Sequence, residues 1–260
     1  YPVDPIASST LHRTDPRACA QLRTQLIERG YAVISINDAQ TRESLHRAVH
    51  PFEPEQTFRF PARDGISHYD EIQRACFQIL YGTAVACTKA LWACTPELQA
   101  GFPEIATKIE ATEHPDFQLF GGADSNSPFA SPDAPFAHTF FNIFNYDHGM
   151  LNDHKDRGVV TAIYIAPGST NGESVSQLWV SRNSEDWVAM DSLVDGGQLI
   201  IFVGEELEEM SKRVGLDFLA ANHNVRVSPR GDYVSHSHSR RDPDANETGN
   251  RRSAALILCS

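Results

Sequence analysis

The stretch HKDRGVVT at residues 154–161 decides how this sequence is interpreted, because it places His154 and Asp156 two positions apart at the start of an apolar, strand-like run. The same His-x-Asp spacing occurs at residues 68–70 and 114–116, but neither of those pairs leads directly into a strand of the C-terminal half. On an extended segment, residues i and i+2 project to the same face, so an imidazole and a carboxylate can reach one metal ion. The 154–161 stretch is therefore the candidate metal site.

A catalytic metal needs a third ligand, because two side chains do not hold it firmly. His223 lies in AANHNV at 220–225, at the start of a later strand-like run, and we expect it to meet the first two ligands from across the β structure. Two histidines and one carboxylate on one side of a metal leave other positions open, which is the arrangement of non-haem Fe(II) oxygenases. The alternative for a His and an Asp near a strand end is an ordinary turn or surface pair.

The C-terminal half consists mostly of short strand-like runs joined by Gly, Asn and Asp, which is typical of a β-sandwich or barrel. The predicted strands cover residues 138–146, 159–166, 177–181, 187–190, 198–203, 224–227 and 253–259. One helix is predicted among them, over about residues 205–214. A Gly-, Ser-, Asp- and Pro-rich loop, residues 121–135, precedes this region.

The N-terminal part is predicted to be mostly helical. Asp15 and Pro16 read as the start of a helix and Gly30 as its end, a strand follows, and the remaining helices are expected over residues 39–49 and about 69–94. We therefore expect a mainly β fold with flanking helices. It would form one domain over residues 1–260, with a mostly helical part at 1–120 and a β core at 138–260 that carries the metal site.

Further motifs surround the candidate ligands in a recurring order. Residues 154–161 fit HxDxGxxT; around them lie, in chain order, YPVD (1–4), RGYAV (29–33), NY (145–146), LWV (178–180), WV (187–188), GGQLIIFVGEEL (196–207), HNV (223–225) and RRS (251–253). This succession resembles the isopenicillin N synthase-like family of 2-oxoglutarate- and Fe(II)-dependent dioxygenases. The resemblance spans most of the chain and is strongest from residue 145 to residue 260.

The resemblance implies a double-stranded β-helix, a jelly-roll barrel with the helical N-terminal layer packed outside. It also implies that the three candidate ligands hold Fe(II), that Arg251 and Ser253 bind the distal carboxylate of 2-oxoglutarate, and that Asn145 is a further cosubstrate contact. Two positions apart on a strand, Arg251 and Ser253 can both point into the barrel, where a guanidinium fork matches a carboxylate. The alternative is that Arg251 and Arg252 simply end a basic loop.

Three features depart from the pattern of that family. Asp147 stands where relatives usually carry the second tyrosine of Asn-Tyr-Tyr-Pro, and the connection from Asn145 to His154 is short. A long polar stretch, residues 228–250, also separates His223 from the arginine. It carries His236, His238, Arg240 and Arg241. We consider three roles for it: a substrate-facing lid, an inert loop, or an alternative metal or cosubstrate contact.

The expected function is oxidation of a C–H bond in a small-molecule substrate, with Fe(II), 2-oxoglutarate and O2 as the reactants that the resemblance implies. Hydroxylation, desaturation and ring closure stay open, because the iron and the cosubstrate perform the difficult step. Two alternatives are an Fe(II)-dependent oxidase of the same fold that does not use 2-oxoglutarate, and a non-catalytic jelly-roll binding protein. Phe141, Phe144 and Trp179 either line the substrate pocket or belong to the ordinary core.

Composition sets the remaining expectations. The formal charge of −12 argues against nucleic acid as a partner, because an acidic surface repels phosphate. No apolar run is long enough to span a membrane. The five cysteines include no CxxC pair, which suggests a reducing, cytoplasmic location; Cys76, Cys87 and Cys94 share one helix face as small core residues or, alternatively, as a thiol site. The sequence begins at Tyr1 rather than Met, so a targeting segment is not readable, and neither is the oligomeric state.

Overall fold

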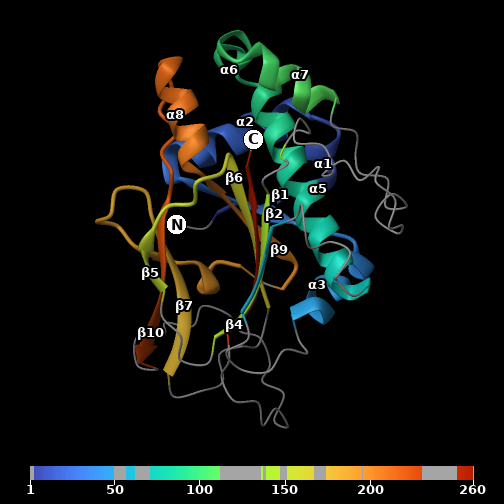
Figure 1. Cartoon of the computed structure of the whole chain (residues 1–260), viewed down its shortest axis with the longest axis vertical. Helices are drawn as coiled ribbons and strands as arrows, with labels where there is room; N and C mark the ends of the chain where they lie inside the picture. The colour runs from blue at the N-terminus through green and yellow to red at the C-terminus, as the bar shows by residue number, and fades with distance from the viewer. Residues whose placement is uncertain are drawn as a thin grey trace.

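Two β-sheets face each other, and helices cover the outer side of the larger one (Figure 1). The larger sheet has the strand order β1 (Ile6–Ala7), β2 (Tyr31–Ser35), β9 (Gln198–Val203), β6 (Val160–Ile165), β11 (Arg251–Leu258), β4 (Phe140–Tyr146), β3 (Thr57–Pro61). The smaller sheet has the order β5 (Leu151–His154), β10 (Asn222–Pro229), β7 (Ser174–Ser181), β8 (Val188–Ala189). The chain therefore has mixed sheets with flanking helices, in agreement with the predicted mainly β class.

The computed structural model describes residues 3–49, 57–61, 71–111, 136, 139–146, 151–166, 174–194, 196–229 and 251–259. Its helices are α1 (Ser8–His12), α2 (Pro16–Arg29), α3 (Ala39–Val49), α5 (Glu71–Ala93), α6 (Pro96–Gly101), α7 (Pro103–Ala111) and α8 (Glu205–Arg213). The predicted loop at 121–135 and the His-x-Asp pairs at 68–70 and 114–116 lie outside these residues.

The alternation of side chains along the central strands separates two cores. On β6, Ala162 and Tyr164 pack with the core that includes α2 and α5, whereas Ile163 and Ile165 pack with the core that includes β7 and β10. All six residues of β6 are buried, as expected for a strand that is covered on both faces. The face of the larger sheet that carries Ile163 and Ile165 therefore lines the space between the two sheets. The candidate metal site lies on this same side of the sheet.

Local sequence signals account for the helix boundaries in the N-terminal part. The side chain of Asp15 accepts hydrogen bonds from the amides of Arg17 and Ala18, which starts α2, and Gly30 ends it with a left-handed φ of 78°. The predicted helix at 39–49 is confirmed as α3, and the long helix is confirmed as α5 over the described part of its predicted range.

The structure also contains elements that the sequence did not predict. The long helix α5 is followed directly by a further helix, α6, which begins at Pro96. Strands β1, β3 and β5 were missed; β1 and β3 lie at the edges of the larger sheet, and β5 lies at an edge of the smaller one. Edge strands depend on a single neighbour for their hydrogen bonds, so their sequence pattern is weak.

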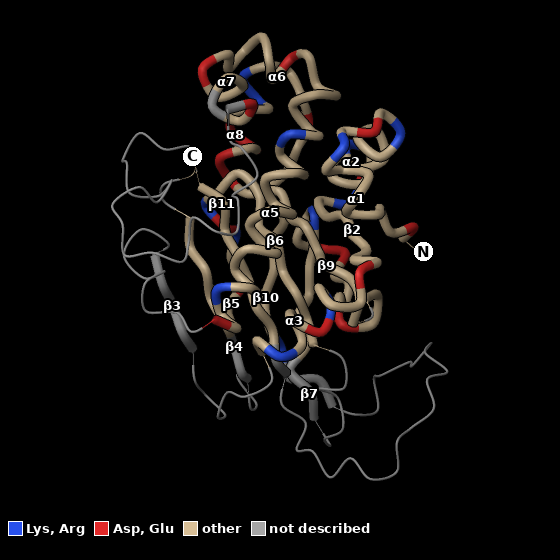
Figure 2. The backbone as a smooth tube through the Cα atoms, turned by 90° about the vertical axis from the view of Figure 1, so that its right-hand side faces the viewer, with Lys and Arg blue, Asp and Glu red and all other residues tan. Residues whose placement is uncertain are grey.

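Charged residues lie mainly on the helices and connections, whereas β6 and β9 carry none (Figure 2). Among the described residues, no helix is long and apolar enough to cross a membrane. All five cysteines are free; Cys76 and Cys87 are fully buried on α5, where burial raises the pKa of both thiols. These two cysteines therefore behave as the small core residues that the helical spacing predicted.

Candidate metal centre

Two of the predicted ligands lie side by side in the smaller sheet. His154 is the last residue of β5, His223 is the second residue of β10, and the antiparallel register makes them direct partners. Their ring centroids are 4.1 Å apart. The prediction that His223 meets the other ligands from across the β structure is therefore wrong: it comes from the adjacent strand, because β5, which the sequence did not reveal, pairs with β10.

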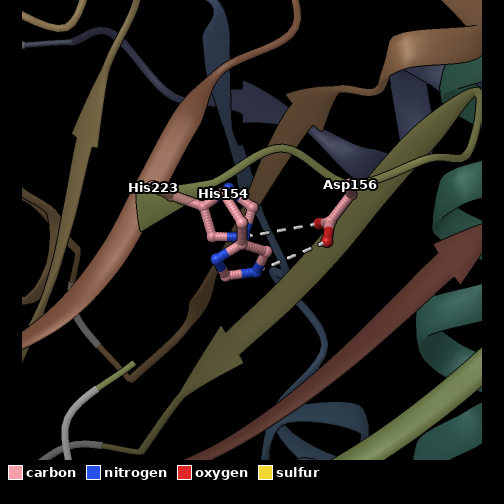
Figure 3. A group of neighbouring side chains, drawn as sticks. All are labelled: His154, Asp156 and His223. Atoms are coloured by element: carbon pink, nitrogen blue, oxygen red, sulfur yellow. Dashed lines mark ion pairs between the residues drawn. The ribbon is translucent and has the colours of Figure 1, made fainter. Parts of the chain in front are cut away.

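Asp156 completes the group from the connection between β5 and β6. Its Oδ1 lies 3.9 Å from His154 Nε2 and its Oδ2 lies 3.6 Å from His223 Nε2. Figure 3 shows the carboxylate facing both imidazole rings. One ligand atom from each of the three residues lies within 4.8 Å of the other two, and no other such group of His, Cys, Asp and Glu occurs among the described residues. The structure thus brings together all three residues predicted as metal ligands.

Backbone carbonyls orient both imidazoles toward the carboxylate. His154 Nδ1 lies 2.8 Å from the carbonyl oxygen of Asn152, and His223 Nδ1 lies 3.2 Å from that of Ala221. A carbonyl oxygen only accepts, so each Nδ1 carries the proton and donates it. In a neutral imidazole the other nitrogen, Nε2, then has a free lone pair, which is the state that a metal requires.

The threonine of HxDxGxxT holds the carboxylate. Thr161, on β6, donates from its hydroxyl to Asp156 Oδ2 at 2.6 Å, and both residues are buried. Hydrogen bonds to a ligating carboxylate fix its orientation and are part of what sets metal affinity. The sequence pattern included Thr161, but its role becomes visible only when β6 is placed beside the Asp156 loop.

Burial is uneven around the three residues. His223 is 4% exposed, whereas the side chain of His154 is 36% exposed, so solvent reaches the group from the His154 side. Burial lowers the pKa of His223, which the nearby carboxylate of Asp156 partly offsets. The ring of Phe202, on β9, lies 5.3 Å from that of His223 and closes the inner side of the group.

Close backbone contacts explain the glycine of the motif. A Cβ atom on Gly158 would overlap the carbonyl oxygen of Leu258 and would lie 2.8 Å from Ile257 Cγ2. A Cβ atom on Gly204 would in turn overlap the carbonyl of Gly158. The loop after Asp156 therefore passes between the end of β11 and the start of α8 with no room for a side chain at either glycine.

A β-bulge follows the histidine pair. His223 pairs with His154 and Val225 pairs with Leu151, so two residues of β5 face the single residue Asn224 of β10. The side chain of Asn224 donates to Asp153 Oδ1 at 2.6 Å across this bulge. Bulges are common beside active sites, where they direct a side chain. This bulge lies directly before His154 and so affects how that side chain is directed at the end of β5.

The predicted cosubstrate residues lie on two neighbouring strands of the larger sheet. Ser253 is 2% exposed on β11, and Arg251 begins that strand. Asn145, on β4, is paired in the register with Arg252 rather than with Arg251 or Ser253. The side chains of Arg251 and Asn145 lie outside the described residues, as do Asp147 and residues 230–250 of the polar stretch.

The three aromatic candidates for a substrate pocket have different outcomes. Phe141 is fully buried and its ring contacts Phe77 of α5 at 5.6 Å, so it belongs to the core between the larger sheet and the helices. Trp179, on β7, is partly buried. The side chain of Phe144 lies outside the described residues.

Comparison with known proteins relates this geometry to a fold. No family model matches the sequence, and no curated protein matches it. Three similar solved structures are a candidate oxygenase from Shewanella oneidensis, a candidate 2OG-Fe(II) oxygenase family protein from Caulobacter crescentus, and JOX2 in complex with 2OG, Fe and JA.

The likeness extends over the whole chain although the sequences are distant. The Shewanella protein is 16% identical with a TM-score of 0.55, over 100% of this chain and 90% of that one. The Caulobacter protein is 14% identical with a TM-score of 0.52, over 99% and 86% of the two chains. JOX2 is 10% identical with a TM-score of 0.52, over 100% and 75%. The chain therefore shares its fold with these three proteins.

Proposed function

We propose that this chain is a non-haem Fe(II)- and 2-oxoglutarate-dependent dioxygenase that oxidises a C–H bond of a small-molecule substrate. The observation that carries the proposal is the convergence of His154, Asp156 and His223 on one point, with both Nε2 atoms directed toward the carboxylate. The shared fold supports it independently, since the ligand-bearing segments of this chain lie in a fold that also occurs in 2OG-Fe(II) oxygenases.

The donor set fits Fe(II). Atoms that each lie ~2.1 Å from a common ion are at most about 4.2 Å apart. The distance from Asp156 Oδ1 to His154 Nε2 is 3.9 Å and that from Asp156 Oδ2 to His223 Nε2 is 3.6 Å, so each imidazole lies within this limit of one carboxylate oxygen. Two neutral imidazoles and one carboxylate on one side are the ligands of non-haem Fe(II) oxygenases, and they leave positions for other ligands.

For 2-oxoglutarate we propose Arg251 and Ser253 as the residues that bind the distal carboxylate. Ser253 is buried, and residues two apart on a strand share a face of the sheet, which supports a joint role with Arg251. A guanidinium binds a carboxylate through two parallel hydrogen bonds. Asn145, on the adjacent strand, stays a prediction as a further contact.

The chain itself supplies binding, orientation and exclusion of water. When bound, Fe(II) and 2-oxoglutarate supply the activation of O2, which no side chain can provide. Thr161 orients the Asp156 carboxylate, and the buried ring of Phe202 beside His223 shields the inner side of the site from water. The more exposed His154 side is where we place the approach of substrate.

We further propose that the two sheets form a double-stranded β-helix and that residues 1–260 act as one domain. The core that contains α2 and α5 also contains residues of β6, β9 and β11, so the helical part and the sheets share buried side chains. This continuity supports a single cooperative unit.

Turnover with Fe(II) and 2-oxoglutarate tests the proposal. The purified protein should consume O2 and form succinate with a panel of small molecules, whereas His154→Ala and Asp156→Ala should remain folded by circular dichroism and lose both activities. O2 consumption without succinate would instead favour the oxidase that does not use 2-oxoglutarate, for which the replacement at Asp147 leaves room. Absence of both activities and of metal binding would favour a binding protein.

A further inference from the structure

The first turn of α8 is attached to the loop that carries Asp156. The backbone amide of Glu205 donates to the carbonyl oxygen of Asp156 at 2.8 Å. The amide of Glu206 donates to the carbonyl oxygen of Gly158 at 3.2 Å. Amides in the first turn of a helix have no acceptor within the helix, and here the loop provides the acceptors. The helix therefore holds the loop through its backbone.

A buried glutamate one turn further along α8 binds two other parts of the chain. Glu208 is 8% exposed, and its Oε2 accepts from Lys155 Nζ at 3.0 Å and from the backbone amide of Ala220 at 2.8 Å. Its Oε1 accepts from Lys212 of the same helix. One carboxylate oxygen thus bridges two segments that are far apart in the sequence.

These two segments are the ones that carry the metal ligands. Lys155 lies between His154 and Asp156, and Ala220 lies shortly before His223 on the way into β10. Neither Lys155 nor Glu208 belongs to the group of candidate ligands. Any effect of Glu208 on the metal must therefore pass through the backbone of the two segments.

The geometry points to Glu208 as a positioning residue that ties the His154–Asp156 segment to the His223 segment and so sets the spacing of the three ligands. This inference rests on the proposed function, because it concerns the metal that those ligands would hold. A glutamine at this position would have one acceptor and one donor group. It is nearly the same size, but it lacks the negative charge that pairs with Lys155 and Lys212, and its amide NH2 would face one of these donors.

The probe for this role is Co(II). This divalent ion binds similar nitrogen and oxygen ligands, and its visible absorption reports its coordination. We expect Glu208→Gln to raise the dissociation constant for Co(II) about 10- to 100-fold, as loss of an outer-sphere support does, and to alter the absorption bands. Glu209→Gln is the matched control, because Glu209 is exposed on the same helix. Lys155→Met should weaken binding in the same direction, and Lys155→Arg, which keeps a donor for Glu208, should restore it.

Two results would overturn the inference. The first is a Glu208→Gln protein whose Co(II) affinity and absorption are unchanged. If only its melting temperature falls, Glu208 has a purely structural role. If Glu208→Gln does not fold, unchanged affinity in the partly exposed Lys155→Met has the same meaning.

A wild-type protein that binds no Co(II) would contradict the proposed function. In that case the role of Glu208 is tested separately, by comparing amide hydrogen exchange of metal-free wild type and metal-free Glu208→Gln. Faster exchange in Glu208→Gln at both residues 156–159 and residues 220–223 supports the tie. Unchanged exchange at residues 156–159 overturns it.

Discussion

His154 and His223 are direct partners in the register of β5 and β10, so a single strand pairing sets the separation of two of the three candidate ligands. A slip of one residue would turn the side chains of one strand to the other face of the sheet and separate the histidines. The bulge beside the pair and the hydrogen bond from Asn224 to Asp153 oppose such a slip. The third ligand depends on a different element, because Asp156 is held by Thr161 of the larger sheet.

Replacing Thr161 by valine tests that second support. Valine has nearly the shape of threonine but no hydroxyl, so the Asp156 carboxylate loses its donor. We expect Thr161→Val to fold and to bind Fe(II) about 10- to 100-fold more weakly, measured by anaerobic titration. Thr161→Ser keeps the donor and should bind close to wild type. Equal affinities of the two variants would show that the hydroxyl does not support the ligand.

Replacing Gly158 by alanine tests the packing of the ligand loop. The added methyl group would overlap the Leu258 carbonyl, and the backbone of β11 has little freedom to move away. Overpacking of this kind costs about 1–3 kcal/mol, so the free energy of unfolding in urea should fall by that amount. The neighbouring Arg157 is exposed, and Arg157→Ala should leave stability unchanged. A Gly158→Ala protein as stable as wild type would mean that the loop can relax.

Much of the fold was predictable because its signals are local. The cap residues of α2, the periodicity of α3 and the apolar runs of β6 and β9 depend on neighbouring residues in the sequence, and the structure confirms all four. Strand β5 was not predictable in this way. Its sequence, LNDH, has no strand pattern, and it becomes a strand because β10 provides hydrogen-bonding partners on one side.

The candidate site was predictable in its ligands but not in their supports. His154, Asp156 and His223 stood out because a motif and a spacing marked them. Glu208 did not, because it is one of several glutamates at the start of α8, and a glutamate on a surface helix is ordinarily solvated. Its partners Lys155 and Ala220 are distant in sequence, so its role is visible only in the tertiary structure.

The stability that Glu208 provides should depend on pH. Burial alone would raise the pKa of Glu208, but hydrogen bonds from Lys212, the Ala220 amide and Lys155 outweigh it and hold the pKa below its usual range. The ionised carboxylate therefore stabilises the folded state above the unfolded-state pKa of about 4.3, and this contribution is lost as the pH falls through the lower folded-state pKa. In urea unfolding, wild type should exceed Glu208→Gln in stability at pH 7, and the difference should shrink as the pH falls below about 4.3. A difference independent of pH would mean that ionisation of Glu208 contributes nothing.

The role proposed for Arg251 is tested against its neighbour on β11. Arg251→Lys keeps the positive charge but loses the planar fork that binds a carboxylate through two hydrogen bonds. The KM for 2-oxoglutarate should therefore rise at least about tenfold, as loss of one charge-assisted hydrogen bond would cause. Affinity for Fe(II) should be unchanged, because the three metal ligands are untouched. Arg252→Lys is the matched control: Arg252 is the next residue of the strand, and adjacent residues face opposite sides of a sheet. Equal KM values for the two variants would assign the distal carboxylate to another residue.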